Sequence, residues 1–134
     1  MQDLFPFINF LFNVMVAGLC GVLIAKSMQG RGRSPVFGLQ PLFAIGACGL
    51  MIIATIHPLG NPGLMAAGTA IGVGLICAGI ILRTSTLVSG IRSAAAIWMS
   101  AIAGLLIGES LFLEGAVIAI LTYFSLTLLP GETS

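Results

Sequence analysis

The sequence predicts an all-α integral membrane protein, a polytopic bundle of about five transmembrane helices with short connections. Hydrophobic residues make up 58% of the 134 residues and charged residues only 7%, and the mean hydropathy is +1.17. Soluble domains average about 25% charged residues, so 5 basic and 4 acidic side chains are too few to cover a water-facing surface. The apolar residues also fall into runs of the length that crosses a bilayer, about 17–25 residues. We therefore expect a single transmembrane domain over residues 1–134.

The predicted spans are about 4–26, 39–57, 64–82, 91–107 and 111–129. The first run is longer than the apolar core of a signal peptide, about 7–15 residues, so we expect it to remain as a span. Pro6 and Pro41 fall in the first turns of their runs, where a missing N–H costs no hydrogen bond. The remaining prolines fall in predicted connections or after the last run, at Pro35, Pro58, Pro62 and Pro130.

The basic residues give the expected orientation. With five spans, every lysine and arginine falls on one side of the membrane, at Lys26, Arg31, Arg33, Arg83 and Arg92. Basic residues mark cytoplasmic loops, so the N-terminus is predicted outside and the C-terminus inside. We expect the protein to be integral to the bacterial cytoplasmic (inner) membrane.

Small residues recur at four-residue intervals in the third and fourth spans. Such spacing lets helix backbones approach closely within lipid. It indicates either packing within one subunit or a seam with a second copy or another membrane protein. The candidate packing residues are Gly68, Gly72, Ala96, Ser100, Gly104 and Gly108.

A few polar and aromatic residues are candidates for contacts. Glu114 lies near the start of the fifth span, after Glu109; it can extend toward headgroups, contact a partner or, least expected, handle ions. His57 is either an interfacial turn residue or a ligand to a metal or pigment. Trp98 is expected to pack between helices, to lie at the membrane interface or to contact a partner. The cysteines lie in apolar runs and are expected to act as small hydrophobic residues, at Cys20, Cys48 and Cys77.

The sequence contains no recognisable catalytic motif. There is no serine, histidine and acid set, no phosphate-binding loop and no clustered metal ligands. The sequence names no cofactor, and no basic cluster is long enough to predict nucleic-acid binding. We expect a non-enzyme whose partners are membrane lipids and another membrane protein or a second copy.

The segment from Asn61 to Phe112 resembles the core of the MgtC/SapB family of bacterial membrane proteins. The family typically has Asp-Pro, a spacer, a glycine-rich GIGFLGAG stretch, aliphatic residues and a basic residue. Here Asn61-Pro62 corresponds to Asp-Pro, and the run that begins at Ile71 corresponds to the glycine-rich stretch and the aliphatic residues. Arg83 corresponds to the basic residue. The run that follows, Val88-Ser89-Gly90-Ile91-Arg92-Ser93-Ala94-Ala95-Ala96-Ile97-Trp98, is similar to the family's V-x-G-L-T-T-A-A-x-x-W, and Gly104 and Gly108 match the next glycines.

The departures from the family pattern fall on polar positions. The acid of the family's Glu-Arg pair after the first helix is missing around Lys26, and the Asp of Asp-Pro is Asn61. The Thr-Thr pair is Arg92-Ser93. Polar groups inside a membrane are usually kept for function. This chain therefore resembles the family in its small packing residues but lacks most of the family's polar residues. Many larger members also carry a soluble C-terminal domain, and this sequence stops at Ser134.

These observations favour a non-catalytic accessory or regulatory subunit that acts through lateral contacts with a larger membrane complex. The resemblance implies a second hypothesis, a modulator of magnesium limitation, membrane energetics or virulence. An ion carrier is a third hypothesis, disfavoured by the shortage of polar residues within the spans.

Overall fold

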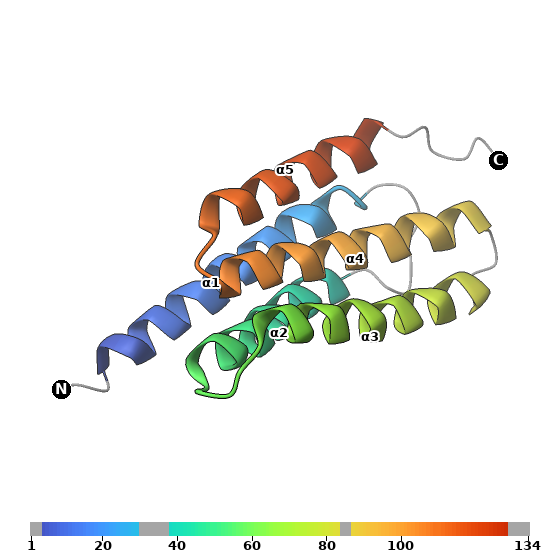
Figure 1. Ribbon diagram of the computed structural model, residues 1–134. Helices are drawn as coiled ribbons and strands as arrows, with labels where there is room; N and C mark the ends of the chain where they lie inside the picture. The colour runs from blue at the N-terminus through green and yellow to red at the C-terminus, as the bar shows by residue number, and fades with distance from the viewer. Residues whose placement is uncertain (1–3, 30–37, 84–86, 129–134) are drawn as a thin grey trace.

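The described residues of the computed structural model, 4–29, 38–83 and 87–128, form five α-helices and contain no strand. This result confirms the predicted all-α bundle. Figure 1 shows the helices lying side by side and alternating in direction along the chain. Their bounds are α1 Leu4–Lys26, α2 Leu39–Ile56, α3 Pro62–Arg83, α4 Leu87–Gly108 and α5 Phe112–Leu128.

Four of these helices are long and apolar enough to cross a membrane, namely α1 to α4. α5 has 17 residues, which at 1.5 Å per residue is about 25 Å. That length is at the lower limit for a transmembrane helix. The chain is therefore an integral membrane protein with four full-length candidate spans and one shorter apolar helix.

The helix ends follow local backbone chemistry, and α3 begins earlier than predicted. Pro62 is the first residue of α3 rather than part of the connection, the position where proline's fixed φ and missing N–H suit a helix. Asn61 caps this helix, since its Oδ1 accepts a hydrogen bond from the Leu64 N–H at 3.0 Å. Gly38, before α2, has φ 94°, a left-handed conformation that favours glycine. Pro35 and Pro130 lie outside the described residues.

The alternating helices place charged residues at two distinct ends. Lys26 ends α1, Arg83 ends α3 and Arg92 lies in the second turn of α4. Figure 1 shows these helix ends at one end of the bundle, called here the basic end. The opposite end, called here the turn end, carries the α2–α3 turn at 57–61 and the α4–α5 turn at 109–111. Arg31 and Arg33 lie outside the described residues.

Membrane orientation remains a prediction, and labelling of cysteine variants tests it. Gln29, just after α1, is exposed at the basic end, and Leu59 is 89% exposed at the turn end. Because the three native cysteines are buried, they give little background labelling. A membrane-impermeant maleimide should label Leu59→Cys in intact cells and Gln29→Cys only after permeabilisation. The reverse pattern would place the basic end outside and contradict the predicted orientation.

Helix α4 is the centre of the bundle and contacts each of the other four helices. Its buried residues are mostly small, which permits close approach on several sides. The larger core side chains, Ile97 and Ile107, are fully buried. In contrast, α3 is peripheral: it packs on α4, touches α2 only slightly and does not contact α1 or α5. This arrangement leaves α2 and α3 beside each other without filling the space between them.

Arg92 joins α4 to the last turn of α5. Its Nη2 donates a hydrogen bond to the carbonyl oxygen of Leu126, one of the last four carbonyls of α5, which have no partner within their own helix. A cation is also favourable at a helix C-terminus because of the helix dipole. Arg92 therefore stabilises the basic end in addition to marking its predicted orientation.

The Arg92→Met variant should lower the melting temperature of the purified protein. Hydrogen bonds to charged groups contribute about 1.5–3 kcal/mol, and the Leu126 carbonyl loses this partner. Arg83→Met removes the same charge from an exposed position at the same end and should have little effect. Thermal unfolding of both variants in one detergent checks the difference. Equal melting temperatures would show that the Arg92 bond contributes nothing to stability.

Candidate lateral contact site

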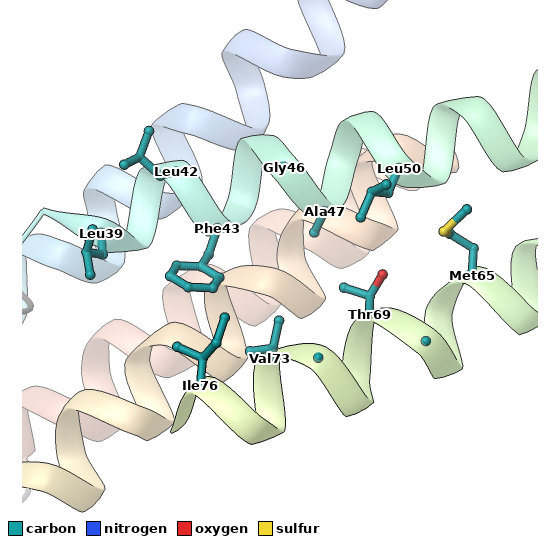
Figure 2. Close-up of a pocket in the computed structure, with 12 residues that line it drawn as sticks. Leu39, Leu42, Phe43, Gly46, Ala47, Leu50, Met65, Thr69, Val73 and Ile76 are labelled. Carbon is teal, nitrogen blue, oxygen red and sulfur yellow. The ribbon is translucent and has the colours of Figure 1, made fainter. Parts of the chain in front are cut away.

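An apolar groove lies between α2 and α3 and is called here the α2–α3 groove. It has a volume of about 480 Å³. Figure 2 shows Phe43 from α2 and Ile76 from α3 pointing toward each other across it. Its lining residues are Leu39, Leu42, Phe43, Gly46, Ala47, Leu50, Met65, Gly68, Thr69, Gly72, Val73 and Ile76.

The groove exists because α2 and α3 both pack on α4 but hardly touch one another. Ala47, Val73 and Phe43 belong to the same apolar cluster as α4 residues Ile97 and Ala101, so they form the inner part of the groove. The outer walls include exposed Leu42 and Leu50. The groove follows the middle of two membrane-spanning helices, where any occupant must be apolar.

Glycines on both walls of the groove have no packing partner among the described residues. A Cβ added at Gly46, Gly68 or Gly72 would meet nothing within 4 Å. The Gly68/Gly72 pair expected to pack therefore does not pack within the described subunit. An exposed glycine step in a membrane helix permits close backbone approach by another helix.

A hydroxyl group lies in the same groove without a hydrogen bond. Oγ1 of Thr69 is buried and makes no hydrogen bond to any described residue, and in Figure 2 it points from α3 toward α2. A buried hydroxyl without a partner costs about 1–3 kcal/mol.

The small residues of α4 lie elsewhere, in the interior of the bundle. Ala96, Ser100, Gly104 and Gly108 are all buried. A Cβ on Gly104 would overlap the carbonyl oxygen of Ala44, and one on Gly108 would lie 2.6 Å from the carbonyl oxygen of Cys48. The two predicted stripes thus have different surroundings: the α4 residues face the interior and the α3 glycines face the groove.

The predicted contact residues outside the groove are spread over the bundle. Trp98 of α4 packs its ring against α3, with Cζ3 3.2 Å from the position of a Cβ on Gly74, and it is 36% exposed. Glu109 and Glu114 are both exposed at the turn end. Glu114 lies in the first turn of α5, where the helix dipole favours a carboxylate. These residues do not border the α2–α3 groove.

His57 is at the turn end and its ring is oriented by the backbone. Nδ1 accepts a hydrogen bond from the Leu59 N–H at 3.2 Å, so the ring proton lies on Nε2, because a neutral imidazole has one donor and one acceptor nitrogen. Among the described residues, no group of three or more His, Cys, Asp or Glu could hold a metal ion.

The sequence prediction did not include the α2 side of the groove. Leu39, Leu42, Gly46 and Leu50 recur at intervals of three and four residues, the spacing of one helix face. In a helix that is apolar all round, this spacing is hidden among other apolar residues. Gly46 was the one residue in this set that could have indicated the α2 side of the groove.

The amino-acid sequence matches a known protein family. The model of the MgtC family matches residues 14–132. Protein MgtC of Salmonella typhimurium is 34% identical over 109 residues, 81% of this chain and 46% of its own. Protein MgtC of Brucella abortus is 33% identical over 102 residues, 75% of this chain and 43% of the relative. An uncharacterised protein of Synechocystis is 31% identical over 108 residues, 80% of this chain and 46% of the relative.

The chain spans a little under half the length of these curated relatives. No solved structure matches it. The family match includes all but the first turns of α1 and reaches past the end of α5, so it covers the groove, the α4 stripe and both turns. The sequence resemblance is confirmed, and the chain belongs to the MgtC family.

Proposed function

We propose that this protein is a non-catalytic accessory or regulatory subunit that binds a transmembrane helix of a larger membrane complex in the α2–α3 groove. The observation that carries the proposal is the set of glycines on both groove walls with no packing partner among the described residues. The groove is apolar along the depth of the bilayer, which suits a membrane helix. We also propose that the membrane is the bacterial cytoplasmic (inner) membrane.

A helix explains these features better than a lipid chain. Glycines give no advantage to a flexible acyl chain, whereas they allow two helix backbones to approach closely. Hydrogen bonds between membrane helices would add little to this packing. Such bonds in membranes average about 0.6 kcal/mol, so close packing supplies most of the affinity.

Extraction in mild detergent tests this function. The tagged full-length chain should co-purify with a reproducible membrane protein at a fixed ratio, identified by mass spectrometry. The partner should be absent when an unrelated membrane protein of similar size carries the same tag. Purification of the chain alone from gently solubilised native membranes, with no enriched membrane protein, would contradict the proposal.

Glu114 supplies a second, separate contact in this proposal. Glu114→Leu should reduce recovery of the partner several-fold, whereas Glu114→Gln, which can still hydrogen-bond, should preserve it. The described basic side chains lie at the opposite end of the bundle, so a partner, a headgroup or a hydroxyl must satisfy this carboxylate. Ion-flux assays in vesicles should not change in either variant. Loss of a measurable flux in Glu114→Gln would instead favour a carrier.

Family membership favours a second candidate, a modulator of the response to magnesium limitation. Growth of a deletion strain at low magnesium discriminates it. A growth defect rescued by a variant that no longer binds the partner would favour this candidate over the accessory-subunit proposal.

A further inference from the structure

A second recess lies at the turn end, separate from the α2–α3 groove apart from a shared wall residue. It has a volume of about 350 Å³ and is bordered by the α2–α3 turn. His57 and Asn61 provide its polar side. Its other walls are largely apolar and include Ile53, Leu59, Leu64 and Met65.

Both polar side chains use their acceptor atoms within the turn. Nδ1 of His57 accepts from the Leu59 N–H, and Oδ1 of Asn61 accepts from the Leu64 N–H. The groups that remain are donors, the Nε2–H of His57 and the Nδ2–H₂ of Asn61. The recess therefore presents two neutral donors beside an apolar wall.

The turn that holds these donors is tightly constrained. The Gly60 N–H donates to the carbonyl oxygen of His57 at 2.8 Å, and the Met65 N–H donates to that of Asn61 at 2.9 Å. Gly60 also has no room for a side chain, because an added Cβ would overlap the Ala54 carbonyl oxygen. A constrained turn lowers the ordering cost of binding.

We propose that this recess binds the phosphodiester of a phospholipid whose headgroup is zwitterionic. Phosphate oxygens are strong acceptors for the two donors, and the apolar walls suit the glycerol and upper acyl chain. Among the described residues, the charged side chains at the turn end are the acids Glu109 and Glu114. This lack of a described cation disfavours a headgroup of high negative charge.

Two substitutions separate ligand binding from folding. Asn61→Asp keeps the oxygen that caps α3 but replaces the donor with a negative charge. His57→Asp keeps an acceptor for the Leu59 N–H, because a carboxylate oxygen takes the place of Nδ1, but it supplies no donor in place of Nε2–H. Both variants should keep the melting temperature of the wild type, measured without added lipid.

Native mass spectrometry of the full chain in detergent gives the readout, with phosphatidylethanolamine as the probe. The wild type should retain this lipid at least about tenfold more tightly than diacylglycerol with the same chains, a difference of ~1.4 kcal/mol. Each variant should lose most of that preference. A Leu113→Ala control, at an exposed position on α5, should retain it.

Three results would overturn the proposal. Equal retention of phosphatidylethanolamine and diacylglycerol by the wild type would show a contact with acyl chains alone. Unchanged retention in both folded variants would show that the headgroup binds elsewhere. Competition by millimolar inorganic phosphate as strong as that by the lipid would assign the recess to a free anion.

Discussion

Gly104→Leu should prevent accumulation of the folded protein. The backbone of α4 at Gly104 lies so close to α2 that even a Cβ would overlap the carbonyl oxygen of Ala44. Ordinary overpacking of a core costs about 1–3 kcal/mol, and here the obstacle is backbone rather than a side chain that can turn aside. Helix α2 would have to move, and with it the cluster that contains Ala44, Cys48 and Ile107.

Leu105→Ala is the matched control for this prediction. Leu105 is the next residue of α4 and is only half-buried. It packs against the apolar cluster that contains Ile97 and Ala101, so truncation removes contacts without moving a helix. Size-exclusion chromatography of fluorescently tagged protein should show a monodisperse peak for Leu105→Ala and aggregate or loss of signal for Gly104→Leu. Similar, mild behaviour of both variants would mean that α4 and α2 are not in close contact at this point.

Gly72→Leu should abolish binding of the partner helix while leaving the bundle folded. An added Cβ at Gly72 meets nothing within 4 Å, so leucine fits without disturbing the subunit. The same side chain occupies the α2–α3 groove, which Gly72 borders, and keeps another backbone from approaching. We expect recovery of the co-purifying protein to fall about tenfold or more, equivalent to ~1.4 kcal/mol of binding free energy.

Gly79→Leu provides the control on the same helix. Gly79 is exposed and an added Cβ there also meets nothing within 4 Å, but this residue does not line the groove. It should bind the partner as the wild type does and show the same melting temperature. Equal loss of partner in both variants would indicate a general effect of bulk on α3 rather than occupation of the groove.

The sequence predicted the helices well because the bilayer imposes a simple rule on them. A span needs a long apolar run, and its ends need proline, glycine or charge. These signals placed α1 at residues 4–26 and α2 to within one residue of its end. The beginning of α4 at Leu87 was missed, because Ser89 and Gly90 precede the most apolar part of that helix.

The lateral surface was harder to predict, because the same residue type has opposite roles in two helices. Gly72 and Gly104 both belong to four-residue small-residue steps, yet the first borders an open groove and the second is covered by α2. The difference comes from which helices are neighbours. That choice depends on packing around α4, on which the spacing of glycines gives no information.

Site-specific photo-crosslinking in native membranes would show directly whether a membrane helix occupies the α2–α3 groove. A photoreactive residue at Leu50, which lines the groove and is 43% exposed, should form an adduct with another membrane protein at native expression. The same residue at Leu82, 86% exposed on α3 but outside the groove, should form none. Protein adducts from both positions at equal yield, or from neither, would contradict helix binding in the α2–α3 groove.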